Sequence, residues 1–465
     1  MKSHFIKDLF FKTTIVCILI LASCSAESNT PKVENETIIP PDNFPYTFGK
    51  MPTDGKKIYI PEELKANDFN SNTSTLSYQR SASTDDIILF WEKGFGQYPG
   101  KTANTKMQVD IAHILTKAEE YFKYYRDTMK FVIAGSSQSD KYRMIVILKY
   151  QDEWLATGSG YDNVIGALWV NPEVLKFDHI IAHEFGHSFQ YQVFCDGGYG
   201  FRDQNYVGSF WEQCAQYMSW QENPDAFTRD IPFFLENAHK NFSHEDFRYE
   251  SIYLMEYWKE KHGIAFLGEL WRKAIAPEHP IQAYKRITNI DQSTLNDEIF
   301  EYACKNLTWD YPLGAHNRDF IQSLSDTEQK KFKHKTKLLK IENDYYQIAA
   351  EQMPQSYGYN AIQLKVPPPG TVVKIDFKGL DNQWSSIAGW RWGVVEIKND
   401  STPIYGEISK DKEGVKTFTS HSDVKELWLI VTGAPTEHVN HVWDDNSAND
   451  ENFPYKVKFE NTSPL

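Results

Sequence analysis

The chain of 465 residues is long for a single hydrophobic core, so its length predicts two or three domains. Hydrophobic residues make up 41% of the sequence and aromatic residues 15%, which indicates well-packed globular domains rather than disorder. The formal net charge is -14 at pH 7, without a compensating cluster of lysine and arginine. Nucleic acids and anionic membrane surfaces select basic patches, so this charge argues against both as partners.

The N-terminus has the pattern of a secretion signal. Lys2, Lys7 and Lys12 precede an apolar run at residues 13–23, which is about half the length of a membrane-spanning helix. We therefore expect a signal peptide at residues 1–24, to be removed from the mature protein.

The end of this apolar run reads "LASC", which resembles the lipoprotein box of bacterial envelope proteins. The resemblance implies that Cys24 becomes the lipidated first residue and that the chain is a lipid-anchored lipoprotein of the cell envelope, on its periplasmic or surface side. The anchor would then be the chain's only contact with a membrane. A polar, proline-containing stretch at residues 25–45 is typical of a tether. An ordinary signal peptide with an incidental cysteine is the alternative.

Cysteine usage beyond this signal is sparse. The remaining residues Cys195, Cys214 and Cys304 are too few for a disulfide framework, although one bridge is possible in an oxidising compartment. No Cys-x-x-Cys pair occurs, so a structural zinc site made of thiolates is not expected.

An N-terminal extension at residues 46–84 precedes a region in which strand and helix patterns alternate. Apolar runs predict strands and a 3.6-residue periodicity predicts an amphipathic helix, in the order strand, helix, strand, strand, at residues 86–91, 107–129, 142–150 and 163–170. Asn171 and Pro172 then have the pattern of a helix start. This order indicates a lobe of mixed helices and strands.

The stretch "AHEFGHSFQ" at residues 182–190 continues from that start. On a helix with about 100° per residue, His183, Glu184, His187 and Gln190 share one face. The opposite face is apolar and consists of Ile181, Ala182, Phe185, Phe189 and Val193. Such a helix buries its apolar side and turns two imidazoles and a carboxylate toward a cleft. Chance is the alternative, because H-E-x-x-H occurs by accident in roughly one chain of this length in forty.

After a glycine-rich loop the pattern is helical to about residue 309, and from residue 346 it changes to short alternating runs typical of strands. The predicted fold class is therefore α+β. We expect a domain at residues 85–310, with a mixed sheet lobe and a helical lobe. A connector at residues 311–345 and an all-β sandwich at residues 346–465 would follow.

A mixed lobe with an H-E-x-x-H helix, followed by a helical lobe, resembles the zincin metallopeptidases. The metzincin extension is absent, since Gln190 and Val193 stand where its glycine and third histidine would be. Gluzincins take a glutamate from a downstream helix, and Glu212 in "FWEQCAQYMSW" follows His187 after 24 residues. The resemblance is therefore to the gluzincin type and covers roughly residues 85–310.

Two positions depart from the best-known gluzincins. Gln216 replaces the aspartate that thermolysin-like enzymes have four residues after the glutamate, and Trp211 replaces the asparagine that the large aminopeptidases have before it. The resemblance thus reaches the superfamily, with the enhancin and mucin-peptidase branch or an uncharacterised group of secreted bacterial lipoproteins as its nearest members.

The resemblance implies a zinc ion held by His183, His187 and Glu212, with Glu184 as the general base. Two imidazoles and one carboxylate leave a fourth zinc position for a water, whose pKa falls to about 7. The expected activity is hydrolysis of peptide bonds in extracellular protein or glycoprotein. The alternative is a non-catalytic lipoprotein that binds glycan or protein on a degenerate zincin scaffold. The intact motif favours the enzyme, while the oligomeric state stays open.

Glu212 has a second possible role. Ser209 lies three residues before it, which is the spacing of a capping box, so the carboxylate could merely cap a helix start. We favour the ligand role because Glu212 has gluzincin-like spacing and begins a helix.

A downstream stretch, "SHEDFRYESIY", offers candidates for binding substrate and stabilising an oxyanion: His244, Arg248, Tyr249 and Tyr253. We favour Tyr249 as the oxyanion stabiliser and expect Arg248, Tyr253 and Gln190 near the substrate. The alternative for each tyrosine is a place in the core, since most tyrosines at helical spacing beside apolar residues are buried.

Two features of the C-terminal region could bind ligands. An acidic loop could coordinate Ca²⁺ through oxygen ligands from Asp444, Asp445, Asp450 and Glu451. Trp390 and Trp392 share one face of a strand and could stack on sugars. We favour a simple Asx-rich turn for the loop and buried core positions for the tryptophans.

Overall fold

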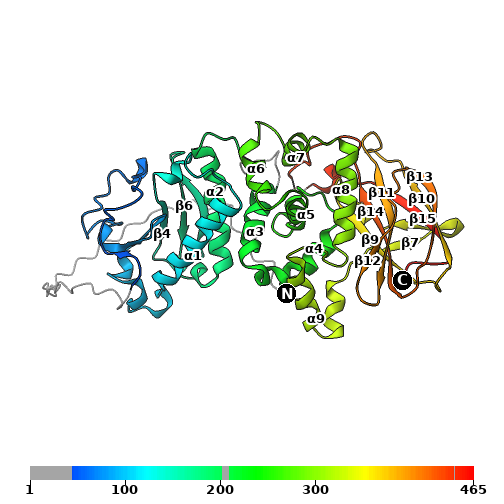
Figure 1. The fold of residues 1–465 in the computed structure, drawn as a ribbon, viewed down its shortest axis with the longest axis horizontal. Coiled ribbons are helices and arrows are strands. Elements are labelled where there is room, and N and C mark those ends of the chain that lie inside the picture. Colours follow the sequence, from blue (N-terminus) through cyan, green and yellow to red (C-terminus); the bar gives the residue numbers. More distant parts are fainter. Residues whose placement is uncertain (1–43, 202–208, 445) are drawn as a thin grey trace, which may run out of the picture. The chain divides into compact units, whose positions relative to one another are not determined.

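The computed structural model describes residues 44–201, 209–444 and 446–465 (Figure 1). The expected signal peptide, Cys24 and nearly all of the expected tether lie outside the described residues, as does Asp445. Within the described ranges no helix combines the length and the apolar character needed to cross a membrane. The fold is α+β, and the described residues form helices and three sheets.

A mixed six-stranded sheet, with the strand order β1-β2-β3-β4-β6-β5, forms the N-terminal part. Its parallel strands β3, β4 and β6 were predicted from their apolar runs, because strands covered on both faces are continuously hydrophobic. The antiparallel edge strand β5 was missed, because "ATGSGY" shows no apolar alternation. The strands are β1 (Thr47–Phe48), β2 (Ser81–Ser83), β3 (Ile87–Trp91), β4 (Met144–Leu148), β5 (Ala156–Tyr161) and β6 (Ile165–Val170).

Two helices, α1 (Ile111–Lys123) and α2 (Asp178–Cys195), pack against each other and against this sheet. Helix α1 contacts β3, whereas α2 contacts β5 and β6. The expectation that helix α2 starts at Asn171 is wrong. The side-chain oxygen of Asn171 instead accepts the N–H groups of Leu155 and Val174. A 3-10 turn at Val174–Lys176 follows, and α2 begins only after it.

The middle of the chain is helical, as its periodicity predicts. Helix α3 crosses α2, and both contribute to the candidate site. The helices are α3 (Phe210–Glu222), α4 (Ile231–Asn237), α5 (Tyr253–His262), α6 (Phe266–Lys273), α7 (Pro280–Thr288), α8 (Gln292–Lys305), α9 (Gly314–Ser323) and α10 (Asp326–Gln329).

Two antiparallel sheets form the C-terminal part, with the orders β13-β10-β15-β8-β7 and β12-β11-β14-β9. Turn residues separate the strands, as their alternating runs predicted, although the short strands β7, β8 and β12 were missed. The strands are β7 (Leu338–Lys340), β8 (Tyr345–Ile348), β9 (Tyr359–Leu364), β10 (Val372–Gly379), β11 (Trp390–Lys398), β12 (Pro403–Tyr405), β13 (Glu413–Thr419), β14 (Val424–Gly433) and β15 (Tyr455–Glu460).

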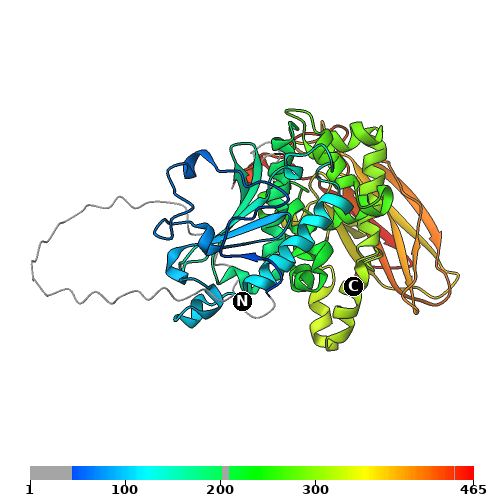
Figure 2. The same ribbon diagram turned by 60° about the vertical axis from the view of Figure 1, so that its left-hand side comes forward.

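The four-stranded sheet of this pair is covered on both faces. One face shares an apolar core with the five-stranded sheet, and Trp390 and Trp392 lie in that core with 2% and 1% exposure. Their expected burial is therefore confirmed. The other face, with Trp428 and Ile430, packs against α8, beside the green helices of Figure 2. The helical core thus continues into the sheet, and the expected boundary near residue 345 stays a prediction.

The acidic loop near the C-terminus contains the expected Asx-rich turn. Asp444 accepts hydrogen bonds from the backbone N–H of Asn446 and the side chain of Asn449, which is an Asx-rich turn. Cys195, Cys214 and Cys304 are all buried, and no disulfide bond joins them.

Candidate metal centre

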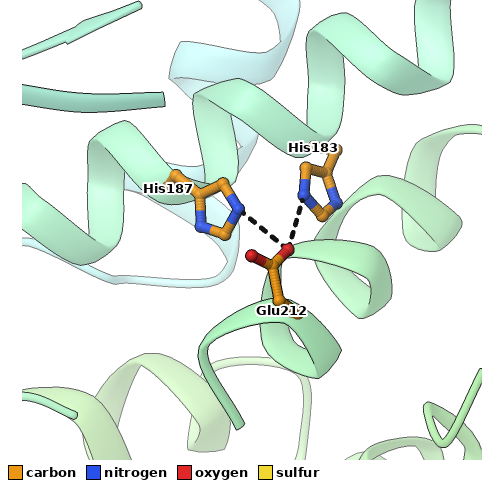
Figure 3. A group of neighbouring side chains, drawn as sticks. All are labelled: His183, His187 and Glu212. Carbon is orange, nitrogen blue, oxygen red and sulfur yellow. Dashed lines mark hydrogen bonds and ion pairs between the residues drawn. The ribbon is translucent and has the colours of Figure 1, made fainter. Parts of the chain in front are cut away.

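Two imidazoles and one carboxylate converge between α2 and α3 (Figure 3). The Nε2 atom of His183 lies 3.2 Å from Oε2 of Glu212, and the Nε2 atom of His187 lies 3.3 Å from the same oxygen. The side chain of His183 is 9% exposed, that of His187 6% and that of Glu212 17%. The structure therefore brings together the three expected ligands at a spacing that can hold one metal ion.

Close backbone packing places α2 between its neighbours. A Cβ atom at Gly186 would lie 3.2 Å from Cα of Ala215 on α3, and a Cβ at Gly158 of β5 would lie 2.1 Å from the carbonyl oxygen of Glu184. Glycine at these positions lets α3 and β5 approach α2 closely. The carboxylate of Glu212, in the first turn of α3, consequently reaches the histidines.

Side-chain amides fix the orientation of both imidazoles. Nδ1 of His183 lies 2.8 Å from Oε1 of Gln216, and Nδ1 of His187 lies 2.7 Å from Oε1 of Gln190. An amide oxygen only accepts, so each Nδ1 donates a hydrogen bond to its glutamine and each Nε2 is the nitrogen that faces the site and could bind a metal. Gln190 also donates to the carbonyl of Trp211 and is fully buried. The expectation that Gln190 contacts substrate is therefore corrected, because it orients His187.

The carboxylate of Glu184 is the unsatisfied group of this site. It is 6% exposed, and within the described part of the chain its Oε2 has no hydrogen-bond partner. A buried carboxylate oxygen without a partner is costly unless a water or ligand satisfies it. His183, His187 and Glu212 therefore have the spacing to hold a metal ion, and Glu184 leaves a buried carboxylate oxygen that a bound molecule could satisfy.

The three converging groups are electrostatically coupled. Burial alone would lower the pKa of His187, but the charge and hydrogen bond of Glu212 raise it to about 9. Burial likewise opposes ionisation of Glu212, yet His187 and His183 hold its pKa well below the usual range. Without a metal, the site thus holds an ion pair, and a divalent cation must displace the histidine proton to bind.

The capping interpretation of Glu212 is wrong. Helix α3 begins after Ser209, whose side chain makes no capping hydrogen bond. Its hydroxyl instead donates to the carbonyl of His244 at 2.7 Å. The carboxylate of Glu212 points to the histidines, as a ligand would, while ligation itself stays a prediction.

The downstream candidates separate into two groups. The ring of Tyr249 lies 6.4 Å from that of His183, and the guanidinium of Arg248 lies 4.8 Å above the Tyr249 ring. Tyr253, in contrast, is 2% exposed and packs against Phe234 with 4.6 Å between ring centroids. Tyr249 and Arg248 thus border the site, whereas the expected contact of Tyr253 with substrate is corrected to a place in the core.

The sequence shows Gln216 only as a departure from the gluzincin pattern and does not predict its contact with His183. The available signal was its spacing, four residues after Glu212, which places both side chains on one face of α3. The close approach of β5 had no comparable signal.

Comparisons with known proteins give a family without a known activity. Residues 50–465 match the model of DUF6055, described as a family of unknown function. No curated protein matches significantly.

Solved structures give only weak likenesses. A functionally unknown conserved protein mutant from Bacillus anthracis str. Ames shares 13% identity over 58% of this chain and 52% of its own, at a TM-score of 0.28. The M60 catalytic domain with the CBM51-1 and CBM51-2 domains of Clostridium perfringens ZmpB shares 10% identity over 87% of this chain and 61% of its own, also at a TM-score of 0.28. This chain thus spans between half and two thirds of each structure, and neither carries a functional argument.

Proposed function

The chain belongs to the DUF6055 family, and we propose that it is a zinc-dependent peptidase of the gluzincin type. The observation that carries the proposal is the unpartnered, buried carboxylate oxygen of Glu184 beside two histidines that converge on Glu212. A merely structural ion pair would not need a further buried carboxylate, since an unsatisfied one destabilises the fold.

The metal ligands in this proposal are His183, His187 and Glu212. Two imidazole nitrogens and one carboxylate oxygen are the donor set of catalytic zinc sites with an open position. When bound, zinc would supply a Lewis acid that makes a water more acidic and polarises a substrate carbonyl. Gln190 and Gln216 hold the imidazoles with Nε2 toward the site.

Glu184 moves the proton in this reaction. Its Oε2 accepts a proton from the attacking water and then passes it to the amine of the departing peptide fragment. Tyr249, whose ring lies beside that of His183, is the side chain we assign to donate a hydrogen bond to the developing oxyanion.

An extended peptide fits the edge of the adjacent sheet. Strand β5 pairs only with β6 among the described residues and packs on α2, which carries the histidines. The outer side of an edge strand offers backbone groups to which an extended peptide can add. This arrangement supports peptide or glycoprotein chains as substrates.

The same proposal includes the finer architecture. We interpret the six-stranded sheet with its helices as the two lobes of a zincin-like domain, and the C-terminal pair of sheets as a β-sandwich. The non-catalytic, glycan-binding alternative is less well supported, because Trp390 and Trp392, its candidate sugar platform, are buried.

The location rests on the N-terminal sequence alone. We propose a lipoprotein anchored at Cys24 and acting on extracellular protein, with the lipid as its only membrane contact. Cys24→Ala should release the chain into the soluble fraction, whereas continued membrane association after signal cleavage would reveal another anchor.

Peptide cleavage tests the activity directly. The purified chain, stripped with a chelator and reloaded with zinc, should cleave members of a mixed peptide library, with new termini detected by mass spectrometry. The stripped chain and the zinc-loaded Glu184→Gln variant are the matched controls, and in both we expect cleavage to fall at least about 10²-fold. Equal cleavage by the variant would assign the activity to a contaminant and overturn the proposal.

A further inference from the structure

A second cluster of potential metal ligands lies outside the candidate metal centre. His244 and Glu245 lie between α4 and α5, and His441 lies in the loop between β14 and β15. Nε2 of His441 is 3.4 Å from Oε2 of Glu245, and Nδ1 of His244 is 3.8 Å from the same oxygen. We propose that these three residues hold a second divalent metal ion, which fastens the β14–β15 loop to the helical region.

Two potential ligand atoms in this cluster are buried without a hydrogen bond. They are Oε2 of Glu245 and Nε2 of His441, and within the described residues neither has a hydrogen-bond partner. The side chain of His441 is 1% exposed, so bulk water does not satisfy its nitrogen. Buried polar atoms are rarely left without a hydrogen bond, and an ion bound between these two atoms would explain why they have none.

A hydrogen-bonded carboxylate orients His441. Its Nδ1 donates to Oε2 of Glu451 at 2.9 Å, and the side-chain amide of Asn241 donates to the other oxygen of that carboxylate. Because Nδ1 is engaged with Glu451, Nε2 is the nitrogen that faces Glu245 and could bind a metal. This carboxylate-imidazole relay is the arrangement that supports metal-ligating histidines.

The charge around the cluster also favours a cation. Glu245, Glu451 and Asp450 surround the two imidazoles, and Oδ2 of Asp450 lies 3.7 Å from Nε2 of His244. The three carboxylates outnumber the two imidazoles at this largely buried place, and a divalent ion would offset their negative charge. The Nδ1 of His244 currently accepts the N–H of Asp246 and would exchange that bond for the metal.

The competing arrangement is an ion pair without metal. Burial opposes protonation of His441, but Glu245 and Glu451 raise its pKa to about 9, so a proton could occupy the place of the metal. In that arrangement Nε2 would donate to Glu245, yet the 3.4 Å contact does not meet hydrogen-bond geometry. Metal content distinguishes the two.

The second site adjoins the first through short contacts. The hydroxyl of Ser209, three residues before Glu212, donates to the carbonyl of His244. Trp443, two residues after His441, lies 5.9 Å from the guanidinium of Arg248, which itself covers Tyr249. A metal at His441 would therefore hold Trp443 and Arg248 at the border of the candidate centre.

The test counts zinc ions. The chain is stripped of metal, loaded with ZnCl₂, freed of excess by gel filtration and analysed by mass spectrometry for zinc. We expect about two zinc ions per parent chain, about one in Glu245→Gln and in His441→Gln, and about one in Glu212→Ala. His438→Gln, in the same loop but outside the cluster, is the matched control and should keep both.

Each failure has a separate meaning. If the parent chain binds one zinc ion and Glu212→Ala binds none, the second site is overturned and the first stays intact. If the parent chain binds one zinc ion and only Glu245→Gln loses it, the result supports the second site and contradicts the proposed peptidase. Glu245→Gln preserves shape, and circular dichroism spectra matching the parent's would exclude unfolding as the cause of its loss. Zinc binding equal to the parent's in Glu245→Gln would overturn the proposal.

Discussion

The Nδ1 atom of His183 lies 2.8 Å from the amide oxygen of Gln216, which follows Glu212 by one helical turn on α3. One helix thus supplies both the carboxylate that faces the imidazole Nε2 and the acceptor that fixes its tautomer. Because residues four apart share a helix face, the two contacts are placed together. The amide orients the imidazole without adding a second negative charge.

Replacing Gln216 should therefore weaken metal binding. Gln216→Ala removes the acceptor for His183, and loss of such a partner typically costs about 10- to 100-fold in metal affinity. The measurement is zinc affinity by competition with a chromophoric chelator. Gln221→Ala, a buried glutamine on the same helix outside the site, is the control and should bind zinc like the parent. Unchanged affinity in Gln216→Ala would argue against the orienting role.

Glu184→Gln should separate catalysis from binding. The amide cannot accept the proton of the attacking water, so we expect peptide hydrolysis to fall by about 10²- to 10⁴-fold or more. Zinc content and thermal unfolding should match the parent, because the proposed mechanism assigns Glu184 to the water and not to the metal. Loss of zinc in this variant would mean that Glu184 is a ligand.

Glu212→Ala and Ser209→Ala form a matched pair. Removing the carboxylate should severely weaken zinc binding at the centre between α2 and α3, because only the two histidines remain there. Ser209→Ala removes only the hydroxyl bond to the carbonyl of His244, so it should cost about 1 kcal/mol of stability and leave zinc affinity unchanged. Equal zinc affinities in both variants would contradict the ligand assignment.

The charge pair between His187 and Glu212 predicts that the stability of the metal-free protein and the stabilisation by zinc change with pH in opposite directions. The pKa of His187 is raised to about 9, so its stabilising contribution is complete below its unfolded pKa of about 6.5 and is lost as pH rises through 9. Zinc displaces that proton, so zinc stabilisation should increase over the same range. Melting temperatures from pH 6 to about 9.5 measure both trends.

Glu212→Gln provides the control for this titration. Without the carboxylate, the partner that raises the pKa of His187 is missing, so the loss of stability toward pH 9 in the metal-free protein should be reduced. A pH profile identical to that of the parent would show that other groups determine the trend.

Two tyrosines test the assignment of the oxyanion donor. Tyr249→Phe should lower kcat by about 10²- to 10³-fold with little change in KM, because the hydroxyl acts on the transition state. Tyr253→Phe should leave both constants unchanged, since its ring lies in the core against Phe234. Equal kinetic effects of the two substitutions would remove Tyr249 from the mechanism.

Local periodicity carried most of the correct expectations. The His-Glu-x-x-His spacing puts its side chains on one helical face whatever the rest of the chain does, because a helix repeats every 3.6 residues. Apolar runs likewise identified β3, β4 and β6, since strands covered on both faces admit few polar residues. The α+β class follows from the order of these patterns.

The sequence by itself determined that His183, Glu184 and His187 share a face, because that depends on backbone geometry within two turns. Only the tertiary structure decided where the Glu212 carboxylate points, since "SFWE" suits a helix cap or a ligand equally well locally. It also decided that Gln216 orients His183 and that His441 meets His244 from a distant loop. Such contacts depend on how elements that lie far apart in the sequence pack together, and the periodicity of one element does not predict which other element it contacts.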